Sequence, residues 1–188
     1  LLHTHYPQPF HRVNALEKLV RTNGYRMLVS YDTVLSQLLS PHDDLIRLDS
    51  DQPLWNGFEI CSTLQQARKT LDADAEKPVF FYAQPMNVHQ FARNSLPSAA
   101  AAHWRFRPGF NNRIAHAVNQ VDACLGGFFA YLKSRGLYDH SIIVITSDHG
   151  DATGEFGRLS HSGSIFPEII RVPLMIHLPE KMRARFVY

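Results

Sequence analysis

The sequence predicts an α/β fold in which helices cover both faces of a mostly parallel sheet. Residues 142–145 are four consecutive β-branched apolar residues, a pattern typical of a strand buried on both faces of a parallel sheet. Residues 110–135, just before this strand, repeat apolar side chains at helical spacing, which indicates a long crossover helix. A helix that leads into a parallel strand is the basic unit of this fold class.

Length and composition are those of an ordinary globular protein. The chain has 188 residues, 45% of them hydrophobic and 19% charged, which is enough for one well-cored domain. A net charge of +2 with interspersed signs gives no basic face and argues against nucleic acid as a partner. No apolar run approaches the roughly 18 residues that span a membrane, and no signal peptide is present. The chain opens at Leu1 without an initiator methionine, and we expect it to be a piece of a longer protein.

The first half of the chain alternates between helical and strand-like segments. Residues 11–23 have helical apolar spacing and end before Gly24, which is a helix stop signal. Residues 25–30 and 79–83 are apolar runs that we interpret as strands, the second of them buried. Shorter elements are expected as well: helices at 32–39 and 58–71 and a strand at 45–48.

The second half supplies the long helix and the central strand. Inside the helix, Gly126 and Gly127 each cost about 1 kcal/mol relative to alanine, and close packing on the sheet would be a reason to keep them. Residues 91–108 have no clear period and are expected to form a loop. The remaining elements are the central strand at 141–147, a short helix at 167–171 and a last strand at 174–177 in the same mostly parallel sheet.

Two side chains that can bind metal stand where the central strand ends. Asp148 and His149 follow it directly, and ligands bind outside the carboxyl ends of strands in open α/β sheets. A carboxylate oxygen and an imidazole nitrogen held there suit a divalent cation, and Gly150 lets the chain turn away without a side chain in the site. The alternative is a polar turn after a strand, and the triplet alone does not decide between the two.

Motifs on both sides of this strand carry a resemblance to a known family. They are Val121-Asp122, Leu132-Lys133-x-x-Gly136-Leu137-x-Asp139, Thr146-Ser147-Asp148-His149-Gly150, Gly154-Glu155-x-Gly157 and Arg171-Val172-Pro173-Leu174. In this order they resemble the C-terminal part of the catalytic domain of the sulfatase family, within the alkaline-phosphatase-like superfamily. The resemblance is dense from about residue 111 to 179 and thinner before that. It implies an alkaline-phosphatase-like fold with Asp148 and His149 as metal ligands.

The resemblance also implies two catalytic histidines. His89 follows the strand at 79–83, where these enzymes carry a histidine that contacts the sulfate or phosphate, although Asn87 and Val88 depart from the usual Asp-Pro pair. His161 matches a lysine or histidine that binds the oxygens of the same group. The alternative for each is a loop or surface histidine without a catalytic role. Asp151 and Glu155 are left out of the site, because acids in loops are usually solvated.

The chemistry of sulfate and phosphate esters fits these residue types. Hydrolysis needs a nucleophile, positive charge against the non-bridging oxygens and an acid for the leaving oxygen. Histidines can hold the oxygens or supply the proton near neutral pH, and a divalent metal can activate the nucleophile. A histidine ligand such as His149 favours Zn²⁺ or Mn²⁺, while Ca²⁺ or Mg²⁺, which prefer oxygen ligands, stay possible.

The nucleophile is absent from the sequence. Sulfatases carry it in a Cys/Ser-x-Pro-x-Arg motif, after a strand that ends in acidic metal ligands, and neither Cys61 nor Cys124 fits that motif. Residues 1–188 are therefore expected to be a single sulfatase-like catalytic domain that lacks its N-terminal portion, with little or no activity alone.

For the parent protein, the resemblance implies a metal-dependent hydrolase of sulfate or phosphate esters. Its substrate would be a small molecule or an ester on a lipid or glycan, and an exported or periplasmic location is favoured. One alternative is a phosphotransferase of the phosphoethanolamine or phosphoglycerol type, which shares Asp148 and His149. Another is a non-catalytic binding module that kept the fold and lost the chemistry.

Overall fold

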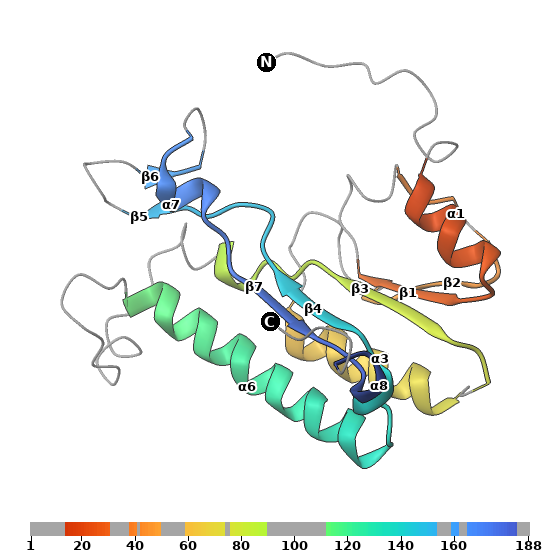
Figure 1. The fold of residues 1–188 in the computed structure, drawn as a ribbon. Coiled ribbons are helices and arrows are strands. Elements are labelled where there is room, and N and C mark those ends of the chain that lie inside the picture. Colours follow the sequence, from red (N-terminus) through yellow and green to blue (C-terminus); the bar gives the residue numbers. More distant parts are fainter. Residues whose placement is uncertain are drawn as a thin grey trace. The chain divides into compact units, whose positions relative to one another are not determined.

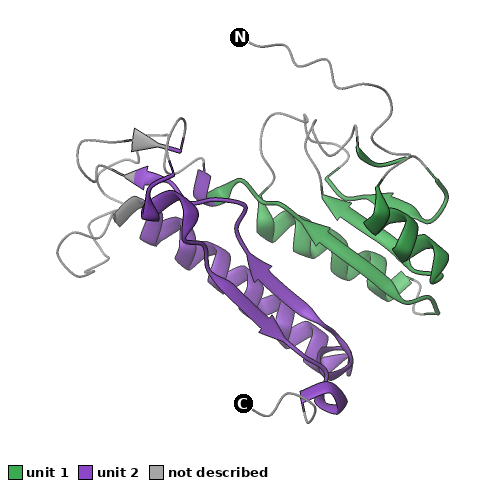
Figure 2. Cartoon of the chain, turned by 45° about the horizontal axis from the view of Figure 1, so that its top comes forward, with its two compact units in different colours: residues 1–87 green, residues 88–188 purple. Residues whose placement is uncertain are grey.

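The structure, a computed structural model, divides into two compact units, Leu1–Asn87 and Val88–Tyr188 (Figure 2). It describes residues 14–30, 38–40, 42–49, 59–73, 76–89, 112–153, 159–161 and 165–183. The loop expected at 91–108 and most of the helix expected at 32–39 lie outside the described residues. The expectation of a single domain fragment stays a prediction.

A parallel sheet forms the centre of the first unit. Strand β1 (Arg26–Ser30) lies between β2 (Leu45–Arg47) and β3 (Val79–Ala83), and both pairings are parallel (Figure 1). Met27, Leu28 and Val29 are at most 2% exposed, as expected for the middle strand of a sheet covered on both faces. The strands predicted at 25–30, 45–48 and 79–83 are thereby confirmed, although β3 is only half-buried.

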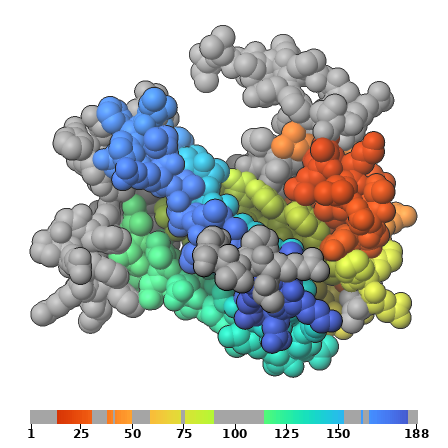
Figure 3. All heavy atoms as spheres, viewed as in Figure 1, coloured from red at the N-terminus to blue at the C-terminus, as the bar shows by residue number. Residues whose placement is uncertain are grey.

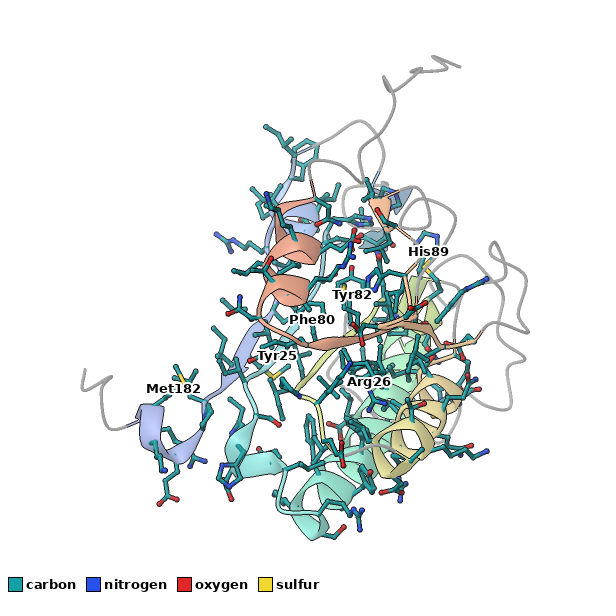
Figure 4. All side chains as sticks on the ribbon, turned by 90° about the vertical axis from the view of Figure 1, so that its right-hand side faces the viewer. Tyr25, Arg26, Phe80, Tyr82, His89 and Met182 are labelled. Atoms are coloured by element: carbon teal, nitrogen blue, oxygen red, sulfur yellow. The ribbon has the colours of Figure 1, made fainter. Side chains whose placement is uncertain are left out.

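Helices cover both faces of this sheet, as predicted. Alternate residues of a strand point to opposite faces. Met27 and Val29 pack against Val20 of α1 (Ala15–Thr22), with Phe80 beside them. Figure 4 shows α1 and α3 (Ile60–Ala73) on opposite sides of the strand that carries Arg26.

A buried carboxylate connects α3 to the sheet through hydrogen bonds, on the face opposite to α1. Asp49 is 1% exposed and accepts hydrogen bonds from Ser30 at the end of β1 (2.8 Å) and from Thr63 (2.6 Å) and Gln66 (2.9 Å) of α3. Because three donors satisfy the carboxylate, its burial is compatible with a stable core.

Helix α1 is shorter than the helix predicted at 11–23. The side chain of Asn14 accepts a hydrogen bond from the backbone N–H of Glu17, so Asn14 is the N-cap and the helix begins at Ala15. Gly24 follows with φ of 74°, the left-handed conformation that ends helices, which confirms the predicted stop.

The second unit contains the long helix and the strand that was predicted to be central. Its elements are α6 (Asn112–Ser134), η2 (Tyr138–His140), β4 (Ile143–Thr146), β5 (Ala152–Thr153), β6 (Leu159–Ser160), α7 (Pro167–Ile170), β7 (Leu174–His177) and α8 (Glu180–Arg183). The helices predicted at 110–135 and 167–171 are confirmed to within a few residues. None of the helices in the described ranges combines the length and apolar composition that a bilayer crossing requires.

The pairing of β4 differs from the prediction. Residues 141–147 and 174–177 were expected in one mostly parallel sheet with the strands at 25–30 and 79–83. Among the described residues, β4 instead pairs with β7 alone, and antiparallel, Ile143 opposite His177 and Thr146 opposite Leu174. The chain leaves the carboxyl end of β4, passes through β5, β6 and α7, and re-enters from that same end, so β7 runs back along β4. The α/β class itself, a parallel sheet with helices, is confirmed.

Strand β4 is also less buried than predicted. Its residues alternate between half-buried and exposed, and Val144 is 55% exposed instead of being buried on both faces. Leu174 and Ile176 on β7 are 64% and 56% exposed, and Figure 3 shows residues of this strand at the surface. The β-branched run therefore predicted the strand, but it did not predict how many of its faces are covered.

Gly126 and Gly127 were expected to pack closely on the sheet, but the structure shows no close packing at either residue. No described atom lies within 4 Å of a Cβ built at either position. We therefore expect Gly126→Ala to stabilise the chain by about 1 kcal/mol, because alanine loses less backbone entropy in a helix. Urea unfolding of the chain would measure this, and an unchanged or lower midpoint would show that these glycines meet a constraint outside the described residues.

Candidate functional site

Asp148 and His149 lie just beyond the carboxyl end of β4 and contact each other. The backbone N–H of His149 donates to Asp148 Oδ1 at 3.0 Å, and the hydroxyl of Ser147 donates to the carbonyl of His149 at 2.5 Å. His149 Nε2 lies 3.8 Å from Asp148 Oδ2. These local hydrogen bonds fix the turn that carries both side chains.

The hydrogen bond of its Nδ1 atom determines the tautomer of His149. His149 Nδ1 lies 2.9 Å from the carbonyl oxygen of Gly150, which can only accept a hydrogen bond. Nδ1 must therefore carry the proton, and Nε2 presents its lone pair on the side of Asp148. Histidines that bind metal usually donate their second N–H in this way to a carbonyl or carboxylate.

The distance within the pair is close to that of two ligands of one cation. Zinc-type ions hold nitrogen and oxygen ligands at about 2.0–2.2 Å in tetrahedral sites, so two ligand atoms are about 3.4 Å apart. His149 Nε2 and Asp148 Oδ2 are 3.8 Å apart, slightly more than this distance. The side chain of Asp148 is 62% exposed, which leaves room for further ligands.

Gly150 is required for a different reason from the one expected. The sequence suggested that it keeps a side chain out of the site, whereas the structure shows a close approach to α7. The N–H of Gly150 donates to the carbonyl of Ile169 at 2.7 Å, and a Cβ on Gly150 would overlap the carbonyl oxygen of Glu168. The missing side chain therefore lets α7 pack directly on the turn that holds Asp148 and His149.

The two predicted catalytic histidines meet at Asp151. His161 Nδ1 lies 2.8 Å from Asp151 Oδ1, and His89 Nδ1 lies 4.0 Å from Asp151 Oδ2. The rings of His89 and His161 are 5.9 Å apart, and the rings of His149 and His161 are 4.0 Å apart. All of these residues belong to the second unit, so its fold alone brings three of the predicted site residues together.

Asp151 was not predicted as a residue of the site. Its side chain is only 18% exposed, so it is not the solvated loop acid that we expected. The signal that identifies it is the strand register: Ala152 pairs with Ser160, and continuing the antiparallel register places Asp151 opposite His161. Glu155, the other acid set aside, lies outside the described residues.

Asn87 explains part of the departure from the family motif. Its amide oxygen accepts a hydrogen bond from the backbone N–H of Ile60 at 3.0 Å, and the residue is 8% exposed. It thus satisfies a free N–H at the start of α3 within the first unit. Its role in the described structure is structural.

Comparison with known proteins gives a consistent picture. The family model described as Sulfatase matches residues 3–185. The chain is 31% identical over 103 residues to an N-acetylglucosamine-6-O-sulfatase of Bacteroides thetaiotaomicron, covering 55% of this chain and 18% of that protein. It is 37% identical over 62 residues to the multifunctional alkaline phosphatase superfamily protein PehA of Trinickia caryophylli, covering 31% of this chain and 11% of the relative.

Solved structures share the fold at low sequence identity. The soluble domain of lipooligosaccharide phosphoethanolamine transferase A from Neisseria meningitidis gives a TM-score of 0.60 at 16% identity, over 88% of this chain and 55% of that one. The lipoteichoic acid synthase LtaP from Listeria monocytogenes gives 0.59 at 16% identity, over 88% of this chain and 46% of that one. The chain thus spans about half the length of these structures, and the predicted alkaline-phosphatase-like fold is confirmed.

Proposed function

The chain belongs to the sulfatase family, and on that premise we propose that its parent protein is a metal-dependent hydrolase of sulfate or phosphate esters. The observation that carries the proposal is the state of His149. Its Nδ1 is held by the Gly150 carbonyl, and its Nε2 lies beside the Asp148 carboxylate, 3.8 Å away. A ring held in this way presents its second nitrogen to a metal, as histidine ligands commonly do.

In this proposal Asp148 and His149 hold the cation. A bound divalent metal would neutralise charge on the non-bridging oxygens of the ester and lower the pKa of the attacking group. The imidazole ligand favours Zn²⁺ or Mn²⁺ over Ca²⁺ or Mg²⁺. The turn itself is preorganised by the hydrogen bonds of Ser147 and by the packing of α7 against Gly150.

His89 and His161 would hold the anion. Their Nδ1 atoms face the Asp151 carboxylate at 4.0 and 2.8 Å, so each Nε2 points away from that carboxylate. A carboxylate behind a histidine fixes the ring, so that Nε2 is directed toward a bound oxyanion or leaving oxygen. Both side chains are partly exposed, at 24% and 31%, as an anion-binding role requires.

Replacing either histidine tests these roles. In the full-length protein we expect His89→Ala and His161→Ala each to lower turnover by on the order of 10²-fold or more, the loss typical of an acid or oxyanion donor. Thermal stability should change little, because neither side chain is buried in the core. Exposed His140 provides the control, and His140→Ala should retain full turnover. Equal activities for all three variants would remove His89 and His161 from the site.

A phosphotransferase is the second candidate. Phosphoethanolamine transferases are among the solved structures that share this fold, although at 13–16% identity they inform on the fold alone. The acceptor distinguishes the two reactions, because a hydrolase transfers the sulfate or phosphate group to water and a transferase transfers it to a second substrate. Assays of the full-length protein with aryl sulfate and aryl phosphate esters, with and without alcohol acceptors, would separate them. No turnover of any ester would favour the non-catalytic binding module.

Substrate and location are proposed by analogy with the relatives. One relative is named for sulfate removal from N-acetylglucosamine, and one structural neighbour is named as a lipooligosaccharide transferase. We therefore propose an ester on a glycan or lipid. A Drosophila relative is named an extracellular sulfatase and another neighbour a periplasmic domain, which supports an exported or periplasmic parent protein.

A further inference from the structure

Helix α1 buries a carboxylate that the proposed function does not use. Glu17 is 3% exposed and lies in the first turn of α1, whereas Leu16 and Leu19 on the same helix are more than half exposed. The helix thus turns an acidic residue toward the interior and two leucines toward the surface. A buried charge is costly unless a partner compensates it, so the surroundings of Glu17 determine how stable this arrangement is.

The partners of Glu17 come mainly from the segment that leads to β2. Its Oε2 accepts a hydrogen bond from the backbone N–H of Ser40 at 3.3 Å. Its Oε1 lies 3.6 Å from Nη1 of Arg21, whose side chain is about half exposed, and 3.8 Å from Nε2 of His42, whose side chain is only 10% exposed. Glu17 Oε1 and His42 Nε2 are both buried, and neither has a hydrogen-bond partner within the described residues. A small side-chain rotation would bring these two atoms to hydrogen-bonding distance.

The position of His42 is coupled to the edge of the parallel sheet. The carbonyl of His42 accepts a hydrogen bond from the N–H of Leu45, the first residue of β2, at 3.0 Å. Leu39 and Leu45, on either side of His42, pack against the hydrophobic core cluster of this unit. The side chain of Asn14, the N-cap of α1, donates to the carbonyl of Leu38 at 3.1 Å. A bond between His42 and Glu17 would therefore fix the start of β2 to α1.

The other charged groups around His42 keep their charge near neutral pH. They are Arg21 on α1, Asp43 and Asp44 in the same turn, and Lys77 before β3. Lys77 Nζ lies 2.7 Å from Asp44 Oδ1, and this hydrogen bond and the charge of Lys77 lower the pKa of Asp44. With Glu17, three carboxylates face two cations. Histidine is the side chain that ordinarily changes charge between about pH 5 and 8, so protonation of His42 supplies the third cation.

We propose that His42 and Glu17 form a pH-sensitive switch that fixes the start of β2 to α1 in acid and loosens it as the pH rises. In acid, the charged imidazole donates its Nε2–H to the carboxylate and compensates the buried charge. Because the folded state binds this proton, the stabilisation is present at the acidic end of the range and is lost as His42 deprotonates. The switch lies within the first unit, so it does not depend on the proposed function.

Hydrogen exchange of the unaltered 188-residue chain tests the switch without any substitution. The N–H of Ser40 donates to Glu17 and the N–H of Leu45 donates to His42, so both amides report on the contact. After correction for the intrinsic pH dependence of exchange, we expect their protection to be about tenfold greater at about pH 5.5 than at about pH 8, the scale of a hydrogen bond to a charged group. Amides of α6 in the second unit are the internal reference and should show no such change.

Substitutions then identify the two groups. His42→Gln, which removes the titrating ring, and Glu17→Gln, which removes the charge and keeps the shape, should each abolish the pH dependence at Ser40 and Leu45. In urea, His42→Gln should raise the unfolding equilibrium constant about tenfold at about pH 5.5 and much less at about pH 8. In the Glu17→Gln background the same substitution should have equal effects at both pH values. His140→Gln, at an exposed histidine of the second unit, is the control and should preserve the pH dependence.

Three results would overturn the proposal. Equal protection of Ser40 and Leu45 at both pH values would show that the contact does not respond to protonation. Greater protection at about pH 8 would show that burial excludes the charged ring, which reverses the sign. A pH dependence that persists in His42→Gln would assign the effect to another group.

Discussion

Asp148→Ala in the full-length protein is expected to lower kcat/KM by on the order of 10³-fold. A metal ion contributes several kcal/mol of charge stabilisation in the transition state, and each 1.36 kcal/mol corresponds to about tenfold in rate. Asp148 would be a direct ligand, 3.8 Å from the free nitrogen of His149, so its loss removes half of the ligands that this chain provides. Metal content should fall in parallel, as measured by elemental analysis of the purified protein.

The chain contains a well-matched control for this variant. Asp139 is as exposed as Asp148, at 63% against 62%, and pairs with Arg183 on the surface of the same unit. Asp139→Ala removes the same charge and should retain activity, because surface ion pairs contribute little. A loss of less than tenfold for Asp148→Ala, with the metal still bound, would contradict its assignment as a ligand.

Gly150→Ala is the second change with a large expected effect. The added methyl group would overlap the carbonyl oxygen of Glu168, so α7 or the turn has to move. Overpacking of this kind costs about 1–3 kcal/mol, and a displacement of about 1 Å at a reacting group can cost about 10²-fold in rate. We therefore expect lower stability in urea and a large loss of turnover in the full-length protein.

Gly126→Ala is the control for Gly150→Ala, because the same methyl group meets no described atom there. Opposite signs of the two stability changes would attribute the Gly150 effect to the contact with α7. If Gly150→Ala were as stable and active as the unaltered protein, the close approach to Glu168 would not matter.

Much of the fold follows from local sequence patterns. The strands at 25–30 and 79–83 and the helix at 110–135 were predictable because apolar periodicity reports which side of an element faces the core. The antiparallel direction of β7 was not predictable, because it depends on the path of the chain between β4 and β7. Helix α1 shows the same limit: Leu19 is 61% exposed while Glu17 is 3% exposed, accepting a hydrogen bond from Ser40.

The candidate site also contains residues that the sequence predicts and a residue that it does not. Asp148 and His149 were predictable because they follow an apolar strand directly, and a strand end is where such folds bind ligands. Asp151 was not predictable, because its partners are His161, ten residues away just after β6, and His89, far upstream. Only the pairing of β5 with β6 shows that this acid faces a histidine and not the solvent.

The pairing of β5 with β6 also determines what insertions and deletions would do. Side chains alternate between the two faces of a strand, so a shift of register by one residue reverses which face each residue occupies. Ala152 opposite Ser160 keeps Asp151 and His161 on the same face. A single-residue deletion within either strand would separate them while leaving every residue type in place, whereas a change of length between the strands would preserve the pair. Two strands of two residues each therefore set the spacing on which the chemistry at His161 depends.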